Sequence, residues 1–149
     1  MAKRLVVLTG ASRGMGAAMA EQLGGIEGVH LLTVSRRPDP ELEARLAPGA
    51  TLTQWGMDLA DSERVARRLG EWLEALGPAD CVLINNAATL VPPGPLAQAS
   101  AEDLLLTTRV GLEAPLVLTA AFLAATSEWE TDRRVLTISS GLGRQAMAG

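Results

Sequence analysis

Short apolar segments alternate along this sequence with longer stretches of helical periodicity, and this alternation constrains the fold more than any other feature. The first apolar segment, Arg4–Thr9 (RLVVLT), is almost uninterrupted, as is typical of a strand buried on both faces. The next stretch, Gly14–Gly24, places Met15 and Met19 one helical turn apart and ends at a double glycine. The same criteria predict four further strands: Val29–Ser35, Thr51–Gly56, Cys81–Asn85 and Arg134–Ser139.

Helical segments are expected between these strands. Asp61-Ser62-Glu63 has the composition of a helix start, and the apolar periodicity continues to about Leu76. Ser100, with Asp103 three residues later, predicts the N-cap of a second long helical stretch. Pro115 lies inside that stretch and predicts a kink or a break between two helices, because proline has no N–H to donate.

The order of these elements predicts the fold class. Alternating β and α units imply an α/β fold, a doubly wound parallel sheet with helices on both faces. The strand order expected for such a sheet is 3-2-1-4-5, and a ligand is expected at the carboxyl ends of the first and fourth strands. The length of 149 residues suits a single domain, 1–149.

Composition narrows the function classes. The net charge of −4 gives no general basic field, so no nucleic-acid partner is expected. No uninterrupted apolar run reaches the roughly 18 residues of a membrane span, so no membrane partner is expected. Cys81 is the single cysteine, which excludes an internal disulfide and favours a cytoplasmic setting. His30 has no metal-ligating residues spaced around it, so we expect a structural histidine and no metal site.

A glycine-rich loop follows the first strand. Thr9–Gly16 reads T-G-A-S-R-G-M-G, with glycines spaced as G-x-x-x-G-x-G between a buried strand and a helix. Glycines at such a turn let backbone N–H groups approach a phosphate closely, although a purely structural turn would use the same residues. On the phosphate-binding interpretation, the loop residues that contact a nucleotide are Gly10, Ser12, Arg13, Gly14, Met15 and Gly16.

The end of the second strand indicates which dinucleotide is bound. A fold selective for NAD places an acidic residue there to bind the ribose 2′-hydroxyl, whereas this sequence has Arg36 and Arg37. Guanidinium groups can bind a 2′-phosphate in a forked geometry, and Arg13 could reach the same phosphate from the glycine loop. We therefore expect NADP(H) in preference to NAD(H). The alternative is that the two arginines are ordinary solvated surface charges.

Further motifs follow in order along the chain, and with the glycine loop they resemble the short-chain dehydrogenase/reductase family. Asp58-Leu59 after the third strand fits the family's adenine contact. Asn85–Ala88 (NNAA) fits its N-N-A-G motif, and Leu136–Ser140 fits its I-S-S segment. The resemblance covers essentially the whole chain. Within the family, Leu112–Pro115 and Ile138–Gly141 look most like the sepiapterin reductase and benzil reductase branch.

The resemblance implies a Rossmann-like fold and a reaction. The family interconverts carbonyls and alcohols by hydride transfer on a small-molecule substrate, and its members commonly form homo-oligomers. Ser140 is the serine that would hydrogen-bond the substrate oxygen. Asp58 and Leu59 would contact adenine, whereas Asn86, Ala87 and Ala88 would lie beside the adenosine ribose. For Asn85 we favour a structural role, an amide tied to neighbouring backbone.

The sequence also departs from the family pattern. It contains no tyrosine, and its only lysine is Lys3, whereas the family's Tyr-x-x-x-Lys motif would fall beyond Gly149. We therefore expect a cofactor-binding fragment, without the last strands of the family fold, that is inactive alone. The alternative is a truncated paralogue that binds nucleotide or self-associates without chemistry. Gly111 stands where the family usually has an asparagine, and residues 141–149 read as an irregular loop.

Overall fold

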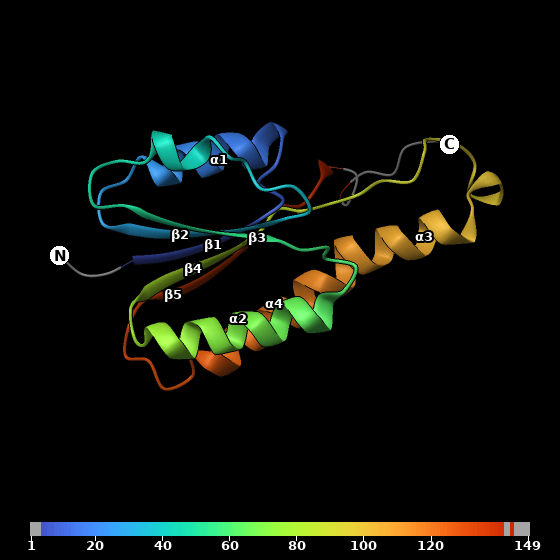
Figure 1. The fold of residues 1–149 in the computed structure, drawn as a ribbon. Helices are drawn as coiled ribbons and strands as arrows, with labels where there is room; N and C mark the ends of the chain where they lie inside the picture. Colours follow the sequence, from blue (N-terminus) through green and yellow to red (C-terminus); the bar gives the residue numbers. More distant parts are fainter. Residues whose placement is uncertain (1–3, 142–143, 145–149) are drawn as a thin grey trace.

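The computed structural model describes residues 4–141 and residue 144, and its centre is one parallel sheet of five strands (Figure 1). The order is β3-β2-β1-β4-β5, which confirms the predicted doubly wound α/β fold. Lys3 and nearly all of the expected loop 141–149 lie outside the described residues. The strands are β1 (Arg4–Thr9), β2 (Val29–Ser35), β3 (Thr51–Gly56), β4 (Asp80–Asn85) and β5 (Arg133–Thr137).

The first three strands have the predicted bounds, β4 begins one residue earlier than predicted, and the last strand differs at both ends. β5 begins one residue earlier than expected and ends at Thr137 instead of Ser139. Its neighbour explains the difference, because the pairing runs from Cys81 opposite Arg133 to Asn85 opposite Thr137, where β4 ends. One further hydrogen bond, from the Ile138 N–H to the Asn85 carbonyl (2.9 Å), follows the strand. Residues 139 and 140 are therefore beyond the sheet.

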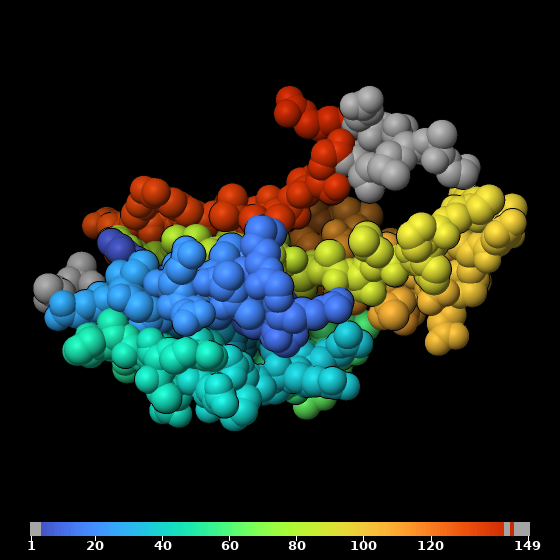
Figure 2. All heavy atoms as spheres, turned by 90° about the horizontal axis from the view of Figure 1, so that it is seen from above, coloured from blue at the N-terminus to red at the C-terminus, as the bar shows by residue number. Residues whose placement is uncertain are grey.

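Helices cover both faces of the sheet (Figure 1). On one face, α1 (Gly14–Gly24) packs over a small apolar core that includes Val6, Leu8 and Leu31. On the other face, α2 (Ser62–Leu76) and α4 (Ala114–Ala125) lie side by side over a larger core, in which Phe122 is completely buried. Figure 2 looks onto the α1 side, with α1 (blue) between the β2–β3 connection (cyan) and β5 (red).

The long helical stretch is interrupted where Pro115 predicts a break. α3 (Ala101–Thr108) begins at Ser100, whose hydroxyl oxygen accepts from the Asp103 N–H at 3.0 Å, as the capping motif predicts. A π-helical turn, η3 (Arg109–Glu113), then joins α3 to α4. Because Pro115 has no N–H for the carbonyl four residues earlier, the regular helical ladder is not continued there, and the wider turn accommodates the change.

A second contact fixes this turn against α2. The Ser62 hydroxyl donates to a carboxylate oxygen of Glu113 at 2.6 Å, and Ser62 is buried although Glu113 is exposed. This bond joins the first residue of α2 to the last residue of η3 across 51 positions of sequence. The position of η3 relative to the sheet is therefore set by a polar contact as well as by apolar packing.

Much of the helical stretch from Ala101 to Ala125 is both apolar and exposed. By length and composition alone it could cross a membrane, although charged residues interrupt its apolar sequence. Leu118 and Phe122 belong to the core against the sheet and α2. The outward side carries leucines that are about half exposed or more: Leu105, Leu112, Leu116 and Leu123.

His30 is partly buried and Cys81 is buried, and both have structural surroundings. His30 Nε2 lies 2.9 Å from the Thr53 hydroxyl, and its ring meets the edge of Trp72. The Cys81 side chain is buried in the larger core. Within the part of the chain that the structure describes, no three His, Cys, Asp or Glu side chains come together as a metal site would need.

Candidate functional site

A cleft of about 460 Å³ lies at the carboxyl ends of β1 to β4. This is the edge of the sheet where the strand order predicts a ligand, because β1 and β4 are neighbours whose connections leave in opposite directions. Of the residues predicted to bind a nucleotide, twelve line it: Gly10, Ser12, Arg13, Gly14, Met15, Gly16, Arg36, Asp58, Leu59, Asn86, Ala87 and Ala88.

The glycine loop forms one wall of the cleft and has no room for side chains at two positions. Gly10 has a φ of +74°, and a Cβ there would lie 2.7 Å from the Cα of Ala87 at the end of β4. A Cβ at Gly16 would lie 2.0 Å from the Gly10 carbonyl oxygen. Gly14 differs, because it combines a φ of +55° with open space around it. The loop therefore packs closely against β4 and stays open where it faces the cleft.

Thr9 and Asn86 tie this loop to β4. The buried Thr9 hydroxyl oxygen accepts from the N–H groups of Asn86 (3.0 Å) and Ala87 (3.1 Å). In return, the Asn86 side-chain amide donates to the carbonyls of Thr9 (3.0 Å) and Gly10 (3.2 Å). Asn86 thus lines the cleft, and its amide holds the glycine loop in place.

Asn85 has a structural role, with a different partner from the one expected. We predicted a contact with backbone, whereas its amide donates to the Thr119 hydroxyl on α4 at 3.2 Å. The residue is 3% exposed, so its polar group needs a partner inside the protein. The two adjacent asparagines therefore join the end of β4 to two different elements. Asn85 bonds to α4, and Asn86 bonds to the loop after β1.

Two arginines line the cleft. Arg13 and Arg36 both line it and are exposed. Arg13 also precedes α1, and among residues 4–141 no side chain caps this helix and no acid occupies its first turn. The positive end of the helix dipole is therefore not compensated by the protein itself, which suits an anionic ligand.

The adenine-contact motif also lies in the cleft. One carboxylate oxygen of Asp58 accepts from the Ala60 N–H at 2.9 Å, a local turn that fixes the carboxylate after β3. The Leu59 side chain is 6% exposed and belongs to the larger core. Asp58 can thus present a polar edge to the cleft, whereas Leu59 contributes mainly apolar surface.

Two predicted site residues are not among the described residues that line the cleft. Arg37 is exposed next to Arg36, and its carbonyl accepts from the Ser35 hydroxyl at 3.0 Å. Ser140 lies three residues beyond the end of β5, the edge strand of the sheet, and is also exposed. Of these residues, Arg13 and Arg36 therefore line the cleft, whereas Arg37 and Ser140 do not.

The cleft also contains residues that sequence reasoning did not single out. They are Val34, Ser35, Met57, Thr89, Leu106 and Val110. Three of them directly adjoin predicted residues at strand ends, so their position follows from the strand bounds. Leu106 and Val110 come from α3 and η3, and no local motif marks them. Thr9 was also missed, although a hydroxyl at the end of a buried strand needs a partner and is a signal in itself.

A dinucleotide fits the cradle that these residues form. Close backbone approach at the glycine loop and an uncapped helix start offer N–H donors to phosphates. Ala87 and Ala88 line the cleft after β4 with small side chains. The chemistry of this donor set, with two arginines in the lining, suits an anionic nucleotide.

Comparison with known proteins agrees with the geometry. Benzil reductase ((S)-benzoin forming) of Bacillus cereus is 34% identical over 151 residues, which cover 98% of this chain and 60% of that protein. A short-chain dehydrogenase/reductase from Burkholderia vietnamiensis has a TM-score of 0.85 at 36% identity, covering 99% of this chain and 68% of that one. A metagenomic short-chain oxidoreductase in complex with NADP has a TM-score of 0.85 at 31% identity, covering 99% and 66%.

These similarities confirm the family that the motifs indicate. The chain spans about three-fifths of the length of the curated relatives that it matches. A family model described as short chain dehydrogenase matches residues 4–149, which is nearly the whole chain. With the parallel sheet, the glycine loop and the cleft in the expected places, the chain belongs to the short-chain dehydrogenase family.

Proposed function

We propose that this chain is the cofactor-binding part of a cytoplasmic NADP(H)-dependent oxidoreductase that interconverts a carbonyl and an alcohol. The observation that carries the proposal is the cleft at the ends of β1 to β4, whose lining includes both Arg13 and Arg36. In a dinucleotide fold the end of the second strand, which Arg36 directly follows here, faces the adenosine ribose. A guanidinium group there favours a 2′-phosphate over a bare hydroxyl, and Arg13 would add a second positive charge to the same cleft.

The roles of the remaining cleft residues follow from their positions. The glycine loop and the start of α1 would bind the pyrophosphate through backbone N–H groups. Asp58 would accept from the adenine amino group, and Ala87 and Ala88 would contact a ribose. NADP(H), when bound, exchanges a hydride with the substrate carbon. Arg37 is proposed as a secondary contact for the 2′-phosphate.

Catalysis would involve Ser140, whose hydroxyl would donate to the substrate oxygen and stabilise the charge that develops there. The reaction also needs a group that exchanges a proton near neutral pH. This chain contains no tyrosine and only one lysine, Lys3. We therefore propose that the chain binds NADP(H) without turning over a carbonyl substrate. Measurable NADPH-dependent reduction of carbonyls by the purified chain would contradict this part of the proposal.

The cofactor preference can be tested by titrating the chain with NADPH and NADH while following nicotinamide fluorescence. NADPH is expected to bind about tenfold or more tightly, because each charge-assisted contact to the 2′-phosphate contributes of the order of 1.5 kcal/mol. Arg36→Gln is expected to weaken NADPH binding selectively. Arg4→Gln makes the same charge change at the opposite end of β1 and should leave both affinities unaltered. Tighter NADH binding would contradict the preference for NADP(H).

We also propose that the chain pairs with a second copy of itself through the exposed leucines of the helical stretch 101–125. Leu112 and Leu116 are 57% and 63% exposed and lie one turn apart, so they share one side of the helix. Such a concentration of exposed leucines on a helix is typical of a contact surface. Its occupant would be the same surface of a second copy, which is the usual two-fold arrangement of homodimers.

A further inference from the structure

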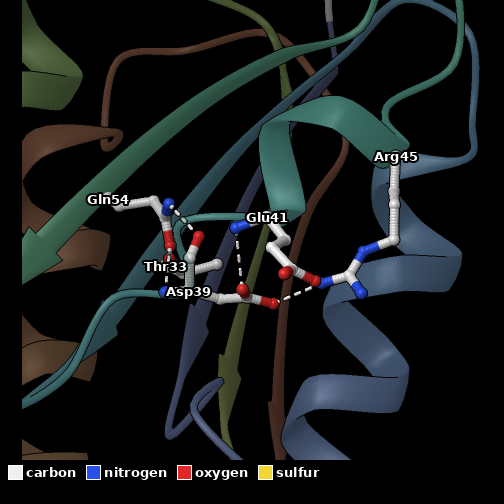
Figure 3. Close-up of polar contacts among 5 residues, drawn as sticks. All are labelled: Thr33, Asp39, Glu41, Arg45 and Gln54. Atoms are coloured by element: carbon white, nitrogen blue, oxygen red, sulfur yellow. Dashed lines mark hydrogen bonds and ion pairs between the residues drawn. The ribbon is translucent and has the colours of Figure 1, made fainter.

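The connection after β2 carries Arg36 and is fixed by a glutamine on the neighbouring strand (Figure 3). The Asp39 N–H donates to Oε1 of Gln54 at 3.0 Å, and Nε2 of Gln54 donates to the Asp39 carbonyl at 2.8 Å. One side-chain amide thus binds both backbone groups of one residue. Thr33 on β2 adds a weaker hydroxyl contact to the same Oε1 at 3.5 Å. The backbone of Asp39 is therefore fixed relative to β2 and β3.

The carboxylate of Asp39 is also fully engaged, and by groups that follow it in the chain. Oδ1 accepts from the Glu41 N–H at 2.9 Å. Oδ2 is paired with the guanidinium of Arg45, the last residue of the 3₁₀ helix η1 (Leu42–Arg45). Figure 3 shows both contacts on the side of Asp39 that faces η1. Asp39 is not among the described residues that line the cleft.

This arrangement matters because Asp39 is an acid placed just after the second strand. Dinucleotide folds that prefer NAD use an acid in this region to bind the ribose 2′-hydroxyl, and such a charge repels a 2′-phosphate. Asp39 lies three residues after Arg36, on the same connection between β2 and β3. The pairing with Arg45 places a positive charge beside the carboxylate, on the side that faces η1.

We propose that Arg45 and Gln54 are positioning residues for cofactor choice: they keep Asp39 away from the cleft and so preserve its preference for a 2′-phosphate. The proposal rests on the proposed NADP(H) function and deepens it. Arg45 would have no contact with the nucleotide and would act only through Asp39. Loss of Arg45 should therefore reduce the discrimination between nucleotides with and without a 2′-phosphate, and leave the binding of their common part unaltered.

The test compares 2′,5′-ADP with 5′-AMP, which differ only in the 2′-phosphate, by calorimetric titration of the full chain. In Arg45→Gln we expect the affinity ratio of the two to fall about fivefold, the effect of roughly one unscreened surface charge pair. The affinity for 5′-AMP should change less than twofold. Gln54→Ala should lower the same ratio, and thermal unfolding of each variant checks that the fold is retained.

A second substitution tests whether Arg45 acts through the Asp39 carboxylate or directly on the phosphate. Asp39→Asn keeps an oxygen for the Glu41 N–H but removes the negative charge. Added to Arg45→Gln, it should restore the wild-type ratio, because no carboxylate is left to redirect. Arg45→Lys, which keeps the charge, should also retain most of the ratio.

The results distinguish failure of the proposed NADP(H) function from failure of the positioning role alone. If the wild-type chain binds neither nucleotide, or binds both equally well, the proposed NADP(H) function fails and this inference falls with it. If the wild-type chain prefers 2′,5′-ADP but Arg45→Gln keeps the same ratio, only the inference is overturned. It is also overturned if Asp39→Asn fails to restore the ratio, because Arg45 would then act on the phosphate directly.

Discussion

Gly16 packs against the Gly10 carbonyl so closely that a Cβ at position 16 would lie 2.0 Å from that oxygen. Gly16→Ala must therefore push the start of α1 away from β1 and widen the loop. We expect a loss of about 1–3 kcal/mol in the free energy of unfolding, as for other overpacked sites, and at least a tenfold loss of nucleotide affinity. Denaturant unfolding and fluorescence titration of the same variant measure the two effects.

Gly70, in the middle of α2, is the matched control for that substitution. A Cβ at this position would meet nothing within 4 Å, so alanine has room there. Gly70→Ala should raise the free energy of unfolding by up to about 1 kcal/mol, because alanine favours the helix, and should leave nucleotide affinity unaltered. Equal effects of the two substitutions would contradict the steric argument for Gly16.

Thr9 is expected to stabilise the loop through its hydroxyl and not through its methyl group. Thr9→Val keeps the shape but leaves the N–H groups of Asn86 and Ala87 without their acceptor, at a cost of about 1–3 kcal/mol. Thr9→Ser keeps the acceptor and should cost less than about 1 kcal/mol, the value of one buried methyl group. Chemical unfolding of both variants gives the comparison, and a valine variant as stable as the serine variant would refute the assignment.

Cys81 should make the protein sensitive to alkaline pH. Burial raises the pKa of its thiol from 9.0 to about 11. Because the thiolate forms more easily in the unfolded chain, the thiol's contribution to stability is fully present below pH 9 and is lost as pH rises through 11. The free energy of unfolding should fall by about 2–3 kcal/mol over this interval, because each pKa unit corresponds to about 1.4 kcal/mol.

The composition leaves few other groups to obscure the titration of this thiol. With no tyrosine and only one lysine, few other side chains titrate in the same interval. Unfolding free energies of the wild type and of Cys81→Ala, measured from pH 8 to pH 11, should therefore converge at the alkaline end. A constant difference between the two proteins across this range would show that the thiol does not ionise on unfolding.

The self-association proposed for the 101–125 stretch can be tested by adding charge. Leu112→Glu together with Leu116→Glu should convert a dimer into a monomer in sedimentation velocity, since four carboxylates would face one another across the contact. Both residues are more than half exposed, so the free energy of unfolding of the monomer should change by less than about 0.5 kcal/mol. Leu90→Glu, at an 83% exposed loop position, is the control and should leave the dimer intact.

The sheet could be predicted from sequence because its strands are short apolar runs bounded by glycine, proline or polar residues. Each of β1, β2 and β3 is recognisable without knowledge of its neighbours. The end of β5 was predicted wrongly, at Ser139 instead of Thr137, because a strand stops where its partner stops. That information belongs to β4 and not to the local sequence.

The candidate site was predictable to the extent that its residues belong to one loop or one strand end. The glycine loop and Arg36 are local signals that the sheet brings together. By contrast, Leu106 and Val110 reach the cleft only because η3 positions α3 beyond the sheet, and the Asp39–Gln54 contacts join positions 15 residues apart. Such contacts depend on how elements pack, which no short motif records.

The hydroxyl of Thr9 has its two N–H partners 77 and 78 positions further along the chain. During synthesis, the glycine loop therefore leaves the ribosome long before the strand that completes it. Until β4 has joined the sheet beside β1, the Thr9 hydroxyl lacks its two N–H donors. The loop carbonyls also lack the side-chain amide of Asn86. Formation of such distant contacts is slow compared with helix formation. Nucleotide capture should thus be a late event in folding, and a ribosome-bound nascent chain that binds nucleotide would report that β4 is already in place.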